Sequence, residues 1–450
     1  MSNGNDRGQW QSRAGFIAAA AGSAIGLGNI WRFPYITGKY GGGAFVLVYI
    51  IFLIIVGYPI MNAELILGRK TQKNAVGAFR TLAPGTPWSI VGWMGVAAGF
   101  IILSYYSVIG GWGIAYIFKT ATYMAKNADH VNIFINFITN PTAPLVWHAV
   151  FMAITVGIVM AGVEKGIERY SKFLMPALFI ILLILIVRSV TLPGAAEGLA
   201  FYLKPDFSKL TAEALLAAMG QVFFSLSLGM GCMITYGSYL SKNEDIPINS
   251  IFIVASDTLI ALLAGLMIFP AVFAFGMEPG TGPGLTFITV PAVFNAMGTG
   301  GAFFGILFFI LLVIAALTSA ISLLEVVTAY VVDEKKWDRK KAALVVGILI
   351  FIVGIPTSLG QGIWSHIRPI RGLDILDSYD FIASNVLLPL GGMLIAIYSG
   401  WFWGTEKMRE EGNLGAKSIK LGGFFDILIK IISPICIFII FLNSIGILKV

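Results

Sequence analysis

Long apolar runs recur along almost the whole chain and are separated by short polar segments. A helix needs about 20 predominantly apolar residues to cross a bilayer, and eleven stretches approach or exceed that length. Hydrophobic residues make up 57% of the 450 residues and charged residues only 12%, a balance foreign to soluble domains. The sequence therefore predicts an all-α polytopic membrane protein. The expected spans are 14–38, 42–69, 88–121, 144–162, 166–190, 212–240, 248–276, 302–332, 342–359, 376–403 and 424–448.

Lys and Arg gather in connections that alternate along the chain. Arg69 ends the second span, Lys70 and Arg80 follow it, and the run DEKKWDRKK follows the eighth span. Because basic residues concentrate in cytoplasmic loops, this pattern places the N-terminus in the cytoplasm and, with eleven spans, the C-terminus outside. The net charge of +7 is then a topology signal and not a sign of nucleic-acid binding. We expect a multi-pass protein of the cell's inner (plasma) membrane.

Other classes of protein are disfavoured by the residues. The stretch RAGFIAAAAGSA has too short an apolar run before its alanines to be a cleaved signal peptide. Cys232 and Cys436 both lie in apolar segments, so no disulfide framework is expected. The sequence holds no HExxH, GxSxG, CxxC or phosphate-loop motif, which argues against an enzyme.

Two expected spans, the first and the sixth, are interrupted. Residues 22–34 read GSAIGLGNIWRFP, and residues 220–240 read GQVFFSLSLGMGCMITYGSYL. Glycines at helical spacing could simply allow close helix packing. However, a pair of broken spans in corresponding positions points to a transporter with an internal repeat and a central binding site. A half-helix starting near Gly28 suits a carboxylate, and carbonyls freed at Gly22, Ala24 and Ile25 suit a cation.

These stretches, together with AALTSAISLLE, resemble the neurotransmitter:sodium symporter family, whose bacterial amino-acid members define the LeuT fold. The resemblance covers almost the whole chain. It implies a 5+5 inverted repeat with broken helices 1 and 6 and eleven transmembrane helices, where many members have twelve. Residues 1–13 would be cytoplasmic, 14–190 and 212–403 would be the two five-helix repeats, and 404–450 would hold an inner loop and the eleventh helix.

The resemblance also implies two sodium ions and no chloride. Asp257 stands where the family usually has Asn, and its carboxylate would supply the negative charge that chloride supplies in animal transporters. From the residues alone, Asp257 could instead be an acid solvated at the inner face, and adjacent Thr318 and Ser319 could merely bond to the preceding helical turn. The first sodium set is Ala24, Asn29, Ser225 and Asp257, and the second is Gly22, Ile25, Ala315, Thr318 and Ser319.

The same resemblance supplies a substrate site and two gates. Phe224 would cover the site, with Arg32 paired to Asp380 on the outer side and Arg7 paired to Asp333 on the inner side. Glu64 would tie the backbone of the broken helix and would not bind ligand. The substrate residues would be Ala24, Gly28, Ile102, Tyr106, Phe224, Ser227, Met230, Ser322 and Leu323.

The expected function is sodium-coupled symport of hydrophobic L-amino acids, aliphatic and aromatic, by alternating access. Met230 replaces a rigid ring found in well-known bacterial relatives, and a flexible side chain can rearrange around ligands of different bulk. A narrow small-aliphatic pocket, a proton-coupled transporter of the same fold and a channel remain alternatives. The expected partners are the amino acid, sodium and the bilayer, with no obligatory protein partner.

Overall fold

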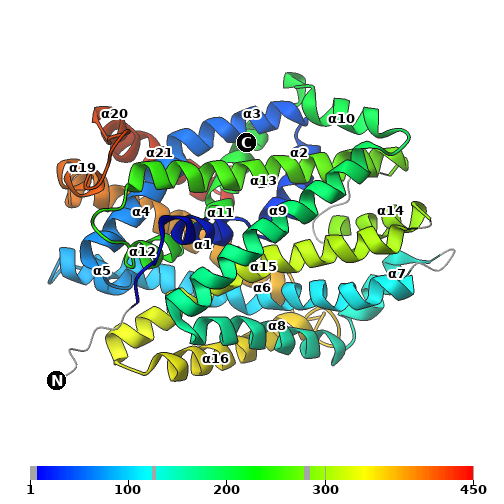
Figure 1. Cartoon of the computed structure of the whole chain (residues 1–450), viewed down its shortest axis with the longest axis horizontal. Helices are drawn as coiled ribbons and strands as arrows, with labels where there is room; N and C mark the ends of the chain where they lie inside the picture. Colours follow the sequence, from blue (N-terminus) through cyan, green and yellow to red (C-terminus); the bar gives the residue numbers. More distant parts are fainter. Residues whose placement is uncertain (1–7, 124–127, 278–283, 299, 449–450) are drawn as a thin grey trace.

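The computed structural model describes residues 8–123, 128–277, 284–298 and 300–448, and regular structure in this part of the chain is helical. Extended residues pair there in two isolated bridges, Gly42 with Pro205 and Ile370 with Leu373. Most helices run along the long axis of the molecule, with α5 and α19 near one end and α7, α10 and α14 near the other (Figure 1). The expected all-α fold is confirmed.

Nine helical segments of the described residues are long and apolar enough to cross a membrane. Several of them contain a π-helical turn and therefore carry more than one label. In chain order they are α3–η2–α4 (Gly43–Phe52, Leu53–Gly57, Tyr58–Thr71), α6 (Ser89–Tyr123), α8 (Ala143–Met160), η3–α9 (Val163–Glu168, Arg169–Val190), α13 (Ile246–Ala274), α15 (Gly301–Lys335), α16 (Arg339–Leu359), α17–η6–α18–η7 (Ile375–Asp380, Phe381–Leu387, Leu388–Ile397, Tyr398–Phe402) and α20–η8–α21 (Gly423–Ile427, Leu428–Ile432, Ser433–Ser444).

Shorter helices lie in the connections between these segments. α5 begins after Asn74, whose side chain accepts hydrogen bonds from the free amides of the first turn. The short helices are α5 (Ala75–Leu82), α7 (His130–Ile138), α10 (Ala195–Leu203), η4 (Phe207–Lys209), η5–α14 (Leu285–Thr289, Val290–Ala296) and α19 (Thr405–Gly412).

The first expected span is broken in its middle. α1 (Arg13–Ala24) ends where Ile25 takes an extended conformation, with φ −75° and ψ 103°. The chain resumes as η1 (Gly28–Arg32) and α2 (Phe33–Lys39), bent by 54° from α1. The break lies within the glycine-rich stretch from which it was predicted.

The sixth expected span is broken as well, into α11 (Ala212–Ser225) and α12 (Cys232–Gly237). Gly229 and Gly231, in the break, have φ of 76° and 74°, a region that glycine adopts without strain. A Cβ on Gly229 would lie 2.6 Å from the Leu388 carbonyl oxygen, so the close approach to α18 also requires glycine. Glu64 Oε1 accepts a hydrogen bond from Gly229 N at 2.7 Å, which confirms its expected contact with this backbone.

Together with the bent first span, the nine long segments give up to ten candidate crossings among the described residues. Neither α11 nor α12 is long enough to cross a membrane alone, so the count of eleven stays a prediction. The division into repeats at 14–190 and 212–403 also stays a prediction.

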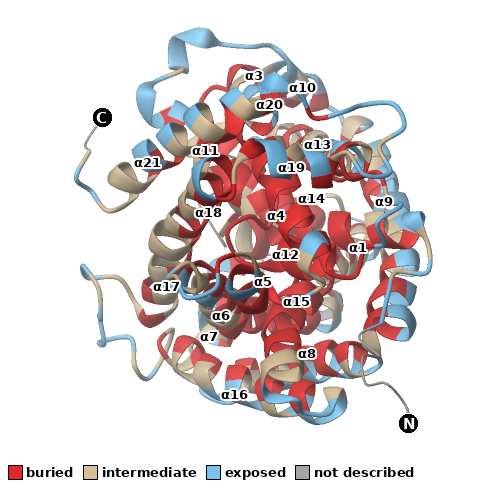
Figure 2. Cartoon of the chain, turned by 90° about the vertical axis from the view of Figure 1, so that its left-hand side faces the viewer, coloured by how far each residue is buried: buried red, intermediate tan, exposed pale blue. Residues whose placement is uncertain are grey.

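α15 lies at the centre of the bundle and packs along α6, with further contacts to α1, α8, α9 and α16. Figure 2 shows buried residues concentrated on inner helices such as α4, α12 and α15, with exposed residues toward the periphery. Outward-facing positions on the long helices are apolar, as at Phe173, Ile180 and Ile348. An apolar exterior around helices that satisfy their own backbone groups is the arrangement a multi-pass membrane protein requires.

Candidate functional site

A cavity lies between the two breaks, where the unwound parts of the first and sixth spans face α6 and α15. Its free volume is about 30 Å³, so the lining residues close tightly around it. None of the residues that line it is charged. Eight of the nine residues expected to bind substrate line this cavity, namely Ala24, Gly28, Ile102, Tyr106, Phe224, Ser227, Met230 and Leu323.

Ser322, the ninth, is not among the lining residues, and its part in substrate binding stays a prediction. Ser23 lines the cavity and donates from its hydroxyl to Ser322 Oγ at 2.7 Å. Ser322 in turn donates to the Ser319 carbonyl oxygen within its own helix, at 2.8 Å. Ser23 was missed because only the packing of α1 against α15 shows which of the two hydroxyls faces the cavity. Its position within the glycine-rich stretch was the available signal.

The start of the second half-helix forms a polar end of the cavity. Leu27 N donates to the Tyr106 hydroxyl at 3.1 Å, which places this hydroxyl beside the start of the half-helix. Gly26 N donates to Asn29 Oδ1 at 3.1 Å. A Cβ on Gly26 would lie 2.6 Å from Ser319 Oγ and 2.9 Å from the Tyr106 hydroxyl, so only glycine fits there. Backbone amides at a helix start beside a hydroxyl suit an anionic group.

Asp257 sits beside this cavity with its side chain fully buried. Asn29 Nδ2 donates to Asp257 Oδ1 at 2.8 Å, and Ser225 Oγ donates to Oδ2 at 2.8 Å. The Tyr49 hydroxyl, which sequence reasoning missed, approaches Oδ2 at 3.4 Å. No ion pair joins Asp257 to a cationic side chain within the described ranges. A buried carboxylate with neutral partners is suited to a small cation.

A second cluster of oxygens lies between α1 and α15. Ser319 Oγ donates to the Ser23 and Ile25 carbonyl oxygens at 3.0 and 3.3 Å. Thr318 Oγ1 lies 3.4 Å from the Ile25 carbonyl oxygen and 3.1 Å from that of Ala315. These hydroxyls therefore bond to their own helix and also reach across to the end of α1. Neutral oxygens converging from two elements can hold a hard cation.

Gly22 lies on the same side of α1 as this second cluster. A Cβ at Gly22 would lie 3.2 Å from both Thr318 Cβ and Met175 Sδ. The structure therefore brings Gly22, Ile25, Ala315, Thr318 and Ser319 together, with Met175 of α9 as an unforeseen neighbour.

On the side expected to be outer, Phe224 covers the cavity, and the guanidinium of Arg32 lies 4.8 Å from the centre of its ring. A larger recess beyond Phe224 is also lined by Arg32 and Phe224. Asp380 accepts hydrogen bonds from the Tyr105 and Ser384 hydroxyls, both at 2.7 Å. Within the described ranges, no ion pair joins Arg32 to Asp380.

On the side expected to be inner, Arg7 lies outside the described residues. Asp333 accepts hydrogen bonds from Asn74 N and Asn74 Nδ2 at 2.9 and 3.0 Å. Trp10 Nε1 donates to the Tyr236 carbonyl oxygen at 3.0 Å, which ties the start of the chain to α12.

Sequence reasoning missed a buried ion pair in the same region. Glu325 is fully buried, and its Oε2 lies 2.5 Å from Arg339 Nη2. The Tyr239 hydroxyl donates to Glu325 Oε1 at 2.5 Å. An acid inside an apolar span was the available signal, since intramembrane ionisable residues mark functional positions by default.

A model of the Sodium:neurotransmitter symporter family matches residues 7–128 and 119–449, which together are nearly the whole chain. The chain belongs to this family. Its members are sodium-coupled transporters, so the protein is a multi-pass sodium-dependent symporter and not an enzyme.

Relatives support the same family assignment across kingdoms. The sodium-dependent transporter YhdH of Bacillus subtilis is 46% identical, with 98% of each chain covered. A sodium-dependent transporter of Haemophilus influenzae is 39% identical over 98% of this chain and 99% of its own. The human sodium- and chloride-dependent GABA transporter 2 is 28% identical over 90% of this chain and 75% of its own.

A solved structure shows the symporter fold directly. MhsT, crystallised in complex with L-phenylalanine, is 50% identical and superposes with a TM-score of 0.90, covering 97% of this chain and 100% of that one. The LeuT-type architecture expected from the resemblance is thereby confirmed.

Proposed function

We propose that this symporter carries hydrophobic L-amino acids, both aliphatic and aromatic, into the cell with two sodium ions and without chloride. The single observation that carries the proposal is the uncharged cavity between the two helix breaks, which has one polar and one apolar end. The protein would work by alternating access in the inner (plasma) membrane, with its N-terminus in the cytoplasm and its C-terminus outside.

The lining of the cavity supports the substrate class. The half-helix amides near Gly28 and the Tyr106 hydroxyl would receive the carboxylate, and the Ala24 carbonyl and Ser227 hydroxyl the ammonium. The side chain would then contact Ile102, Phe224, Met230 and Leu323. A charged side chain placed there would be buried unpaired, at a cost of several kcal/mol. The complex of the similar protein MhsT with L-phenylalanine supports an aromatic substrate.

The two oxygen clusters support two sodium sites. In the first, Asp257 and Ser225 would hold the ion with the Ala24 carbonyl and the Asn29 side chain. The Asn29 amide now turns its NH₂ toward Asp257, so its oxygen would have to rotate to bind the ion. The second site would use the cluster formed by Gly22, Ile25, Ala315, Thr318 and Ser319.

The buried Asp257 carboxylate supports independence from chloride. It places a negative charge that belongs to the protein beside the first sodium site, so a mobile anion is not needed there. The human relative is described as chloride-dependent, whereas the two bacterial relatives are described as sodium-dependent. Chloride is therefore expected to be dispensable for this chain.

Gating would alternate between the two sides. Arg32 and Asp380 would pair when the outer side closes over Phe224, and Arg7 would pair with Asp333 when the inner side closes. Pairs at the water-exposed faces contribute only about 0 to 1 kcal/mol, so they can form and break in each cycle.

The test is uptake of labelled leucine by purified protein in vesicles. Uptake should require an inward sodium gradient, persist when gluconate replaces chloride, and be inhibited by unlabelled tryptophan and tyrosine. Glutamate and lysine should not compete. Uptake driven by a proton gradient without sodium would support the proton-coupled alternative instead. Failure of tryptophan and tyrosine to compete would indicate the narrow aliphatic pocket.

A further inference from the structure

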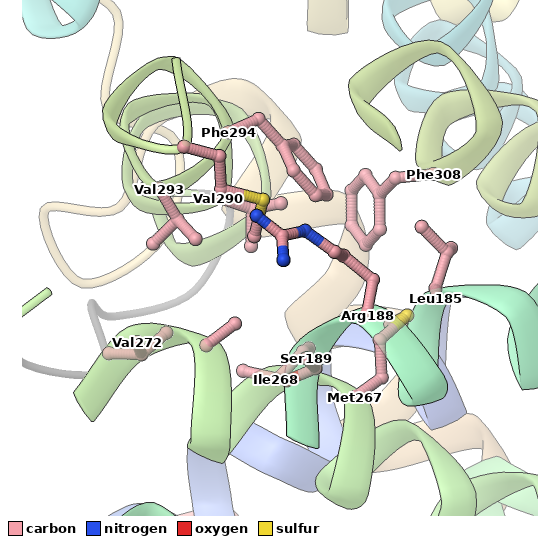
Figure 3. Close-up of a pocket in the computed structure, with 12 residues that line it drawn as sticks. Leu185, Arg188, Ser189, Met267, Ile268, Val272, Val290, Val293, Phe294 and Phe308 are labelled. Carbon is pink, nitrogen blue, oxygen red and sulfur yellow. The ribbon is translucent and has the colours of Figure 1, made fainter. Parts of the chain in front are cut away.

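A second cavity lies between α9, α13, α14 and α15 and shares no lining residue with the central one. Every residue that lines it is apolar except Arg188 and Ser189, which are neighbours at the end of α9. Its apolar wall includes Met267 and Ile268 of α13 and Val293 of α14 (Figure 3). An apolar cavity with one polar corner is typical of a site for an amphipathic ligand.

Arg188 brings a charge into this cavity without a matching anion. Its side chain extends across the cavity, with the guanidinium between α14 and the end of α9 (Figure 3). The described contact of the guanidinium is with the ring of Phe304, at 5.7 Å from the centroid. Among the described residues, no carboxylate forms an ion pair with Arg188. A guanidinium in apolar surroundings is stabilised when an anion joins it.

Ser189 is a second, independent sign of a missing partner. Its side chain is 2% exposed, and its hydroxyl has no hydrogen-bond partner in the structure. Buried hydroxyls are usually satisfied, and serines within helices commonly bond to the preceding turn. An unsatisfied donor next to an unpaired cation therefore indicates a ligand with acceptor oxygens.

We propose that this cavity binds the anion of a long-chain fatty acid. The carboxylate would accept two hydrogen bonds from Arg188 and one from Ser189, and the alkyl chain would pack along Met267, Ile268 and Val293. A single-chain ligand matches the lining better than a two-chain phospholipid, because the polar residues are confined to one corner and the rest of the wall is apolar. Ile184 and Val187, on the same helix as Arg188, are exposed on the apolar exterior, so the bilayer is the expected source of the ligand.

The experiment uses the full-length protein in detergent with a long-chain fatty acid that carries a photoreactive diazirine. After irradiation, mass spectrometry should find the label on peptides around 267–272 and 290–297. Unlabelled fatty acid should compete, whereas the alcohol of the same chain length should not. Arg188→Gln should reduce labelling about tenfold or more, since a charged hydrogen bond is lost. Lys204→Gln, an exposed cation outside the cavity, is the matched control and should leave labelling unchanged.

Ser189→Ala tests the proposal with little risk of misfolding, because it removes only a hydroxyl that forms no hydrogen bond within the protein. It should lower labelling about fivefold while the melting temperature stays the same. Equal labelling of wild type, Arg188→Gln and Ser189→Ala would overturn the proposal. Equal competition by the alcohol, or displacement by anionic phospholipid but not by fatty acid, would overturn it as well.

Discussion

Among single residues, Asp257 has the largest expected effect on ion dependence. Three side chains direct donors at its buried carboxylate, and none of them carries a charge. Its charge is therefore available to a bound cation. The same reasoning separates it from exposed acids such as Asp206, whose pKa is lowered by hydrogen bonds from Ser208 and which lies in a connection.

Asp257→Asn removes this charge and keeps the size of the side chain. Sodium-driven leucine uptake should fall about tenfold or more and should become stimulated by chloride, because an anion can replace the lost charge. Uptake in chloride and in gluconate is the measurement, and Asp206→Asn is the matched control. If leucine uptake by the wild-type protein stops without chloride, Asp257 does not have this role.

The double change Thr318→Ala and Ser319→Ala removes the hydroxyls that reach across to Ile25. The sodium concentration that gives half-maximal uptake should rise about tenfold or more, because a desolvated ion loses two ligands. Thr328→Val on the same helix is the control, since the Thr328 hydroxyl is buried without a hydrogen-bond partner. An unchanged sodium dependence in the double variant would rule out this second site.

Met230→Phe adds rigid bulk to the apolar wall of the cavity. Tryptophan should compete with labelled leucine about tenfold less well, whereas the affinity for leucine itself should change only a few-fold. Comparing the two amino acids within one variant provides the control for folding. Equal losses for leucine and tryptophan would indicate that Met230 does not set the size limit.

At the scale of the elements, the break between α11 and α12 depends on Gly229. Its φ is positive, a conformation that residues with a side chain rarely adopt. A Cβ added at this position would also lie only 2.6 Å from the Leu388 carbonyl oxygen. Gly220 offers a contrast within α11, because a Cβ there would meet nothing within 4 Å. The two glycines stand nine positions apart and differ in what surrounds them.

Gly229→Ala should lower the free energy of unfolding by about 1 to 3 kcal/mol. The measurement is the melting temperature in detergent, which should fall. Gly220→Ala should be neutral or stabilising by up to about 1 kcal/mol, since alanine is the better helix former. Equal melting temperatures for both variants would contradict the role given to the break.

At the scale of the whole molecule, a buried cluster of side chains on the side expected to be inner joins three parts of the chain. Arg339 of α16 reaches Glu325 of α15, and Tyr239 after α12 reaches the same carboxylate. Cys232 at the start of α12 is buried beside Ser322. Its reactivity toward a thiol reagent therefore measures how often the inner side opens to water.

Arg339→Gln leaves the Glu325 carboxylate buried without its cation. Removing one partner of a buried ion pair destabilises a folded protein by about 3 to 5 kcal/mol. The inner side should open more often, so in a Cys436→Ser background Cys232 should react faster with a thiol reagent. Sodium should slow the reaction. The control is Arg80→Gln, which removes an exposed ion pair with Glu334. In this variant Cys232 should react with the thiol reagent at the same rate as in the parent protein. An unchanged rate for Arg339→Gln would show that this pair does not hold the inner side closed.

Most residues of the central cavity were named through the family resemblance. The sequence alone determined the membrane fold and the two helix breaks. These follow from local properties, because the length of an apolar run, a glycine with positive φ and a motif such as GSAIGLGN act within a few residues. The contact of Glu64 with the broken backbone was expected from the resemblance and not from a local property, because its partner Gly229 lies 165 positions further along the chain.

The tertiary structure decided which side chains from different helices meet. Ser23 faces the cavity while Ser322 stands behind it, and Arg32 lies over Phe224 and not against Asp380. The pairing of Glu325 with Arg339 likewise depends on how α15 and α16 pack. Such contacts depend on the rotation and separation of helices, which are set by the packing of the whole bundle and not by any one segment.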